Sequence, residues 1–110
     1  MRGWRIMAKY RNTKVEVDGI LFDSIKEGKR YKELKLMERA NVIHTIECQK
    51  VFKIEVNGMH ICKYIADFAY IENNSLVVED VKSYVTAKLP VYRLKKKLLQ
   101  ATHGITVQEV

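Results

Sequence analysis

The sequence predicts an α/β domain in which two helices flank a mixed β-sheet. Two helix-length segments, near residues 24–40 and 89–103, enclose three β-rich runs that are joined by tight-turn signals. A further β-rich run follows the second helix, and a strand that returns after a helical crossover lies parallel to its neighbour. With 110 residues and 47% hydrophobic content, the chain is long enough for one packed core and too apolar for a disordered segment.

The first hairpin and the first helix are predicted from local turn and capping chemistry. Asp18-Gly19 stands between two short β-rich runs and favours a two-residue type I′ turn. Ser24 then precedes a helical pattern, with Glu27 three residues later, which is the spacing of a capping box. We therefore expect a helix from Ser24 to about Ala40.

The middle of the chain predicts a three-stranded meander. Runs 47–56 and 59–71 are rich in β-branched and aromatic residues and flank Asn57-Gly58, a strong hairpin signal. Asn73-Asn74 predicts the next two-residue turn, because asparagine tolerates the left-handed backbone that such a turn requires. The third strand is expected over 76–81.

The second long helix is expected over 89–103. Pro90 suits its first turn and Gly104 fits a C-terminal cap. Along this segment Leu94, Leu98 and Ala101 predict the apolar face. A last short edge strand is expected over 105–107.

The net charge of +7, from 20 Lys and Arg against 13 Asp and Glu, indicates a polyanionic partner. Nucleic acid is the usual one, with an acidic membrane surface as the rarer alternative. Part of the excess lies in residues 1–14, which include Arg5 and Arg11 and no acidic residue. They predict a basic N-terminal arm ahead of a single domain over 15–110.

Several protein classes are excluded by what the sequence lacks. No apolar run approaches the length of a membrane span. Cys48 and Cys62 have neither the spacing nor the partners of a zinc site, so reduced core thiols are expected. These features predict a cytoplasmic protein with no membrane partner.

Two aspartates break the apolar pattern of the meander. A two-residue turn at Asn73-Asn74 places Asp67 directly opposite Asp80, with Cβ atoms about 4.5–5.5 Å apart. Like charges so placed repel one another, so either one carboxylate is protonated or a cation bridges them. Two converging hard oxygen ligands suit Mg²⁺, with Mn²⁺ as a substitute.

Lys82 is predicted to lie on the same face as these carboxylates. Period-two alternation puts Asp80 and Lys82 on one face of their strand and turns Glu79 to the other. Two aspartates and a metal activate water and neutralise a phosphate, while the lysine stabilises developing charge. The alternative interpretation is an ordinary salt-bridged pair of Asp80 and Lys82 at a strand end, with Asp67 a chance acidic residue.

Glu27 is a further candidate for the acidic site. Helical spacing from Tyr31 and Leu34 places Glu27 on the inward side of its helix, where an acid is costly unless it is paired or bound to metal. Its other interpretation is structural, because the third residue of a capping box bonds the backbone of the cap. Both roles are compatible.

The second helix supplies a predicted DNA-binding surface. No acidic residue occurs from Val81 to Gln108, and the basic residues there include several at helical spacing. A solvated basic face is the plain interpretation, whereas contacts to a phosphate backbone are the functional one. The expected DNA-binding residues, with two from the arm, are Lys88, Arg93, Lys96, Lys97, Arg5 and Arg11.

These acidic and basic residues resemble the motifs of the PD-(D/E)XK nuclease superfamily, which includes restriction endonucleases and archaeal-type Holliday-junction resolvases. Residues 64–68 (YIADF) look like its first acidic motif and residues 78–82 (VEDVK) like its second. Ala66 stands where the motif-naming Pro is expected, and Asp80 replaces the commoner Glu. Short proteins of this kind occur in phages and prophages.

The resemblance implies an αβββαβ core like that of restriction endonucleases and a set of site residues. It implies that Asp67 and Asp80 bind Mg²⁺ together with the Val81 carbonyl, that Lys82 is the catalytic lysine, and that Glu27 is a helix-borne acid near the metal. If the protein is phage-encoded, it acts in the cytoplasm of a bacterial host.

We therefore expect a Mg²⁺-dependent DNA endonuclease of phage origin that recognises DNA structure, such as a Holliday junction, because one small domain has little room for base readout. Symmetric cutting of two strands requires a homodimer. The alternatives are a non-catalytic nucleic-acid-binding module, whose acidic cluster is structural, and a protein-binding phage accessory factor.

Overall fold

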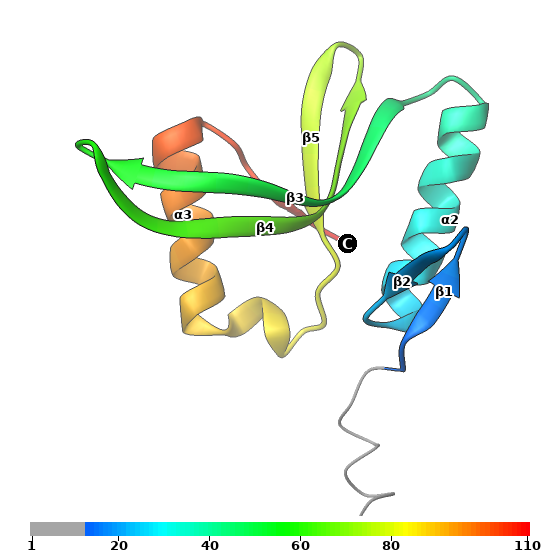
Figure 1. Cartoon of the computed structure of the whole chain (residues 1–110), viewed down its shortest axis with the longest axis horizontal. Helices are drawn as coiled ribbons and strands as arrows, with labels where there is room; N and C mark the ends of the chain where they lie inside the picture. The colour runs from blue at the N-terminus through cyan, green and yellow to red at the C-terminus, as the bar shows by residue number, and fades with distance from the viewer. Residues whose placement is uncertain (1–12) are drawn as a thin grey trace, which may run out of the picture.

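The computed structural model of the chain describes residues 13–110, which form a mixed sheet, a small separate hairpin and two long helices (Figure 1). In chain order the elements are β1 (Val15–Val17), β2 (Ile20–Phe22), α2 (Ile25–Arg39), β3 (His44–Val56), β4 (Met59–Glu72), β5 (Ser75–Asp80), the 3-10 helix η1 (Thr86–Lys88), α3 (Pro90–His103) and β6 (Gln108–Glu109). The large sheet has the order β3-β4-β5-β6; the first three strands are antiparallel, and β6 is parallel to β5. The predicted α/β class with a mixed sheet and two helices is confirmed.

The turn between β4 and β5 sets the register that the site depends on. Asn73 and Asn74 have φ values of 52° and 64°, the left-handed conformation expected of this turn. Phe68 consequently lies opposite Glu79, as predicted. The next position in this register brings Asp67 to the level of Asp80.

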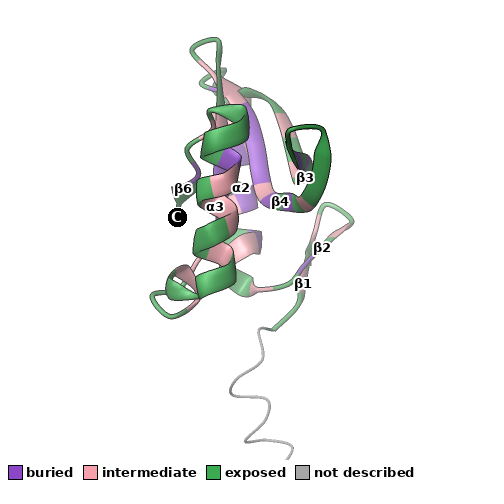
Figure 2. Cartoon of the chain, turned by 90° about the vertical axis from the view of Figure 1, so that its left-hand side faces the viewer, coloured by how far each residue is buried: buried purple, intermediate pink, exposed green. Residues whose placement is uncertain are grey.

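Two apolar clusters hold the helices against the strands. The α2 cluster contains Phe22, Tyr31, Leu34, Ile43, Phe68 and Tyr70. The α3 cluster contains Phe52, Ile54, Tyr64, Ala66, Ala69, Val78, Leu99 and Val107. Leu34 and Leu99 are fully buried, and each such side chain contributes about 1.5–3 kcal/mol on burial. Figure 2 shows the buried part of β4 behind α3, whose outer side is exposed.

The β3–β4 hairpin passes from one cluster to the other along its length. Ile46 and Cys48 pack against the α2 cluster, whereas Phe52 and Ile54 belong to the α3 cluster. Gln49, between them, has a φ of 53° inside the strand, which is uncommon for a non-glycine residue. In Figure 1 the paired strands run together from their tip and then turn upward. The hairpin therefore bends at Gln49, beside Asp67.

The orientation of α3 differs from the sequence prediction. Leu94, expected on the apolar face, is 59% exposed, and Ala101 is exposed as well. Leu99 and the partly buried Leu98 pack against the sheet instead. Because several apolar residues lie around this helix, leucine spacing alone does not decide which side is covered.

The last strand also lies later than expected, at Gln108–Glu109 rather than over 105–107. Ile105 and Val107 pack into the α3 cluster, so they fill the core before pairing begins. The backbone N–H of Val110 donates to the Asp80 carbonyl (3.0 Å), and that of Lys82 donates to the Val110 carbonyl (3.2 Å). The chain after α3 thus supports the end of β5.

Gly28 is expected to resist substitution although it lies inside α2. Alanine favours helix over glycine by about 1 kcal/mol, but a Cβ at this position would lie 2.6 Å from Val15 Cγ2. Moving the β1–β2 hairpin away costs about 1–3 kcal/mol, so we expect Gly28→Ala to be neutral to destabilising. Urea unfolding measures this, with Lys29→Ala as the exposed neighbouring control. A clear gain of stability in Gly28→Ala would contradict the packing.

Within residues 13–110, no helix combines the length and the apolar character that crossing a bilayer requires.

Candidate active site

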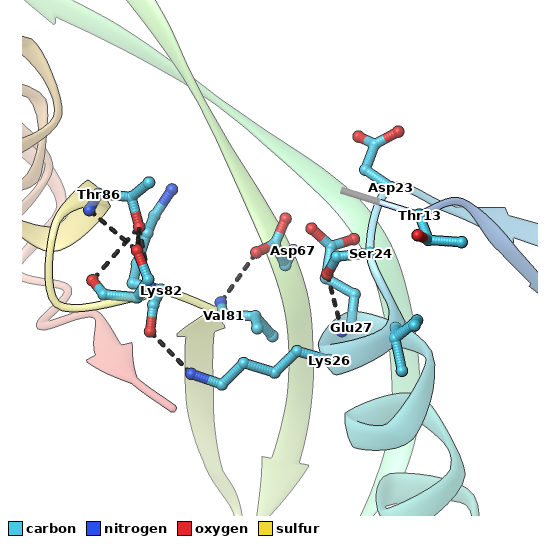
Figure 3. Close-up of a pocket in the computed structure, with 11 residues that line it drawn as sticks. Thr13, Asp23, Ser24, Lys26, Glu27, Asp67, Val81, Lys82 and Thr86 are labelled. Atoms are coloured by element: carbon cyan, nitrogen blue, oxygen red, sulfur yellow. Dashed lines mark hydrogen bonds between the residues drawn. The ribbon is translucent and has the colours of Figure 1, made fainter. Parts of the chain in front are cut away.

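A cavity of about 510 Å³ lies where the start of α2, the bend of β4 and the segment after β5 meet (Figure 3). Its lining residues are Thr13, Asp23, Ser24, Ile25, Lys26, Glu27, Asp67, Val81, Lys82, Ser83 and Thr86. Three separate parts of the fold thus bring Glu27, Asp67 and Lys82 to one cavity. We refer to it below as the acidic cavity.

Asp67 is held by β3 on one side and by the residue that follows β5 on the other. Its Oδ2 accepts a hydrogen bond from the Val81 N–H (2.9 Å), and its Oδ1 accepts one from the Gln49 amide (3.4 Å). Burial raises the pKa of Asp67 above the usual range of an aspartate, while the Val81 N–H and the Lys82 charge act against this rise. The two hydrogen bonds therefore fix the direction of the Asp67 carboxylate.

Glu27 lies in the first turn of α2, three residues after the helix cap Ser24. The Ser24 hydroxyl accepts a hydrogen bond from the Glu27 N–H (3.1 Å), which confirms the predicted helix cap. The Glu27 carboxyl group extends into the acidic cavity and faces Asp67 (Figure 3). Burial raises the pKa of Glu27 to about 7, and the negative charges of Asp67 and Asp23 act in the same direction.

Asp80 lies beside the acidic cavity and does not line it. It is 3% exposed; its Oδ1 accepts a hydrogen bond from the Asp67 N–H (2.9 Å), and the Tyr64 hydroxyl donates to its Oδ2. Burial raises the pKa of Asp80, and the hydrogen bond from Tyr64 lowers it. We expected both aspartates on one face. The bend at Gln49 interrupts the strict alternation on which that expectation rested, so the two carboxyl groups open on different cavities.

Lys82 lies between those cavities and lines both. Its ammonium group is 4.4 Å from the centre of the Tyr92 ring, a cation–π contact. Its charge lowers the pKa of Glu27, Asp67 and Asp80 alike. The predicted lysine therefore lies within electrostatic reach of all three predicted acids.

The donor chemistry of the acidic cavity fits a hard divalent cation. Among residues 13–110 no three Asp, Glu, His or Cys side chains form a ready metal-binding group. Mg²⁺, however, is usually held by only one or two carboxylates, and water and phosphate complete its coordination. Glu27 and Asp67 share the cavity, and burial is the main cause that raises the pKa of both carboxyl groups.

A buried ion pair that sequence reasoning did not find fixes α2 to the sheet. Arg30 donates from Nε to Glu79 Oε1 (2.9 Å) and from Nη2 to Oε2 (2.6 Å), and the Tyr70 hydroxyl donates to the same carboxylate. Glu79 is 1% exposed and points away from Asp80, as predicted. Because Arg30 lies one turn after Glu27, this pair sets where Glu27 enters the cavity. The signal in the sequence was an arginine three residues from an inward-facing acid.

The predicted DNA-binding residues divide into three groups. Lys88, Arg93 and Lys97 are exposed and line one shallow groove of about 280 Å³. Lys96 forms an ion pair with Glu109 (2.7 Å), so its charge is compensated within the chain. Arg5 and Arg11, with the rest of the basic arm up to residue 12, lie outside the described residues.

The raised pKa of Glu27 should make the stability of the metal-free protein depend on pH. In the unfolded chain Glu27 has its usual pKa of 4.5, and in the folded chain its pKa is about 7. Between these values the folded state binds more protons, so stability falls as the pH rises through this window. We expect the unfolding temperature in EDTA to drop from about pH 5 to about pH 7.5, and to drop less in Glu27→Gln. Glu33→Gln on the same helix is the control; equal slopes in all three proteins would refute the assignment.

Comparison with known proteins places the chain in one family. No curated protein and no solved structure shows significant similarity to it. The DUF1064 family, described as "Protein of unknown function", matches residues 7–107, which include every residue of the acidic cavity. The chain therefore belongs to the DUF1064 family.

Proposed function

We propose that this protein is a Mg²⁺-dependent DNA endonuclease with a core of the restriction-endonuclease type. The observation that carries the proposal is that Glu27, Asp67, Val81 and Lys82 line one cavity although they come from a helix, a strand and the segment after β5. Two carboxylates and a lysine are the groups that hydrolysis of a phosphodiester requires.

The arrangement of elements supports the same proposal. A helix, three antiparallel strands, a helix and a parallel strand follow one another from α2 to β6. This is the αβββαβ order that the PD-(D/E)XK superfamily shares. Its acidic motifs fall on β4 and at the end of β5, the positions of Asp67 and Asp80.

Each residue has a distinct task in the proposed reaction. Asp67 and Glu27 would hold Mg²⁺, which when bound neutralises phosphate charge and makes water more acidic. Asp80 fixes the Asp67 backbone through its hydrogen bond to the Asp67 N–H. Lys82 stabilises the charge that develops on the phosphate oxygens. Without metal the pKa of Glu27 is raised to about 7, so binding of Mg²⁺ would displace the proton that this carboxyl group carries at neutral pH and below.

DNA is the proposed substrate because the exposed groove beyond the cavities is basic. Lys88, Arg93 and Lys97 line this groove on η1 and α3, and phosphate contacts of this kind give affinity without base specificity. Structure-directed cutting of branched DNA follows from that lack of base readout. Cutting both strands of a junction symmetrically would take two copies of the chain.

The test is cleavage of linear duplex, single-stranded, flapped and four-way-junction DNA with Mg²⁺ or Mn²⁺. We expect the wild type to cut at least one branched form and Asp67→Asn to cut it at least about 100-fold more slowly. Asp23→Asn is the matched control, because Asp23 lines the same cavity but its side chain is 71% exposed.

The outcome also separates the alternatives. Absence of cleavage of every DNA form with either metal would refute the endonuclease proposal. DNA binding that weakens steeply with salt, without cleavage, would instead indicate a non-catalytic binding module. Weak binding that hardly changes with salt would indicate an accessory protein that acts on other proteins.

A further inference from the structure

A second cavity, of about 370 Å³, lies on the other side of the chain segment that carries the catalytic lysine. Asp80 and Lys82 line it, so it adjoins the acidic cavity through Lys82. None of the roles proposed above uses it. Its walls come from β4, from the residue before α3 and from the first turns of α3.

The walls of this second cavity are apolar but open to solvent. Ile65, Leu89 and Val91 line it and are 53%, 50% and 66% exposed, which is high for large aliphatic side chains beside a cavity. Tyr92 adds an aromatic ring. Ligand cavities typically combine such apolar walls with a few polar groups that orient the ligand.

The charges around the cavity define the class of ligand. Lys63, Lys82 and Lys95 line it, and the one acidic lining residue, Asp80, is buried and bonded to Tyr64 and to the Asp67 backbone. An occupant that matches this surface has an apolar face and carries negative charge. A nucleotide meets both conditions, since its base has apolar faces and its phosphate is anionic.

We infer that this cavity receives an unpaired nucleobase of the DNA strand whose phosphate lies at Lys82. The inference rests on the proposed function and deepens it, because it names the feature of the substrate that is recognised. Bases inside a duplex are stacked and paired, and taking one out costs energy that an already unpaired base does not. Branched, flapped or frayed DNA is thereby preferred without any sequence being read.

The experiment measures binding of flapped DNA in EDTA, with each unpaired nucleotide in turn replaced by an abasic residue. We expect one position at which loss of the base weakens binding about tenfold, the scale of one base–protein stacking contact. Ile65→Ala should abolish this difference. Ile61→Ala is the matched control, since Ile61 lies on the same strand, is 46% exposed and does not line the cavity.

Two results would overturn the inference: affinity that is independent of every base in the flap, or an equal effect of Ile65→Ala and Ile61→Ala. Dimerisation of the free protein that Ile65→Ala alone abolishes would also overturn it, by assigning the cavity to a second copy of the chain. Cleavage of the same DNA with Mg²⁺ keeps the two proposals separate. Base-dependent binding without cleavage would support the nucleobase-binding cavity and refute the endonuclease proposal. Cleavage with an affinity that does not depend on any base would support the endonuclease proposal and refute the nucleobase-binding cavity.

Discussion

Lys82→Met is expected to slow DNA cleavage at least about 100-fold while the protein stays folded and keeps most of its affinity for DNA. Lys82 lines both cavities, and its charge lowers the pKa of all three predicted acids. Stabilisation of charge that appears only in the transition state changes the rate far more than binding. Methionine keeps the length and apolar stem of the side chain, so apolar packing beside Tyr92 is retained although the cation–π attraction is lost.

Single-turnover cleavage and equilibrium binding in EDTA, measured on the same substrate, separate these effects. Lys32→Met is the matched control, because Lys32 is an exposed lysine on α2 that lines neither cavity. A parallel loss of binding and cleavage in Lys82→Met would reduce Lys82 to a DNA-binding residue. An unchanged cleavage rate would exclude it from the reaction altogether.

Glu79→Ala is expected to destabilise the protein by about 3–5 kcal/mol. Glu79 is 1% exposed and forms two hydrogen bonds with Arg30, whose side chain is 23% exposed. Removing the carboxylate leaves the partly buried guanidinium with only the exposed Glu33 as an ion-pair partner (3.0 Å) and also deprives the Tyr70 hydroxyl of its acceptor. Urea unfolding measures the loss.

Two further variants show whether the ion pair is the cause. Glu47→Ala removes a pair with Lys50 whose side chains are 47% and 37% exposed, and should cost no more than about 1 kcal/mol. Adding Arg30→Met to Glu79→Ala should recover part of the stability, because the charge that has lost its buried partner is gone. Equal losses of unfolding free energy in Glu79→Ala and Glu47→Ala would show that the buried ion pair stabilises the protein no more than the exposed one.

What the sequence predicted well depends on chemistry between near neighbours. The turn at Asn73-Asn74, the Ser24 cap and the pairing register follow from backbone preferences of a few residues, and the structure has them as expected. That register was enough to bring Asp67 and Asp80 to one level of the sheet. The predicted direction of Glu79, away from Asp80, followed from the same alternation.

What the sequence did not predict depends on how whole elements meet. The bend at Gln49 separates the carboxyl groups of Asp67 and Asp80. It does not interrupt the alternation of apolar and polar residues along β3, so the sequence pattern does not indicate it. The burial of Leu99 rather than Leu94 is decided by the side of α3 that faces the strands. The partnership of Arg30 with Glu79 joins residues 49 positions apart.

The bonds between β4 and β5 at the site have a consequence for reading the evolution of such proteins. Asp67 accepts from the Val81 backbone and Asp80 accepts from the Asp67 backbone, so each carboxylate fastens its own strand to the neighbouring one. A relative without the proposed nuclease activity would therefore still need both aspartates to keep these strand ends together. Lys82, whose side chain takes no part in this fastening, is the position at which inactive lineages should diverge first.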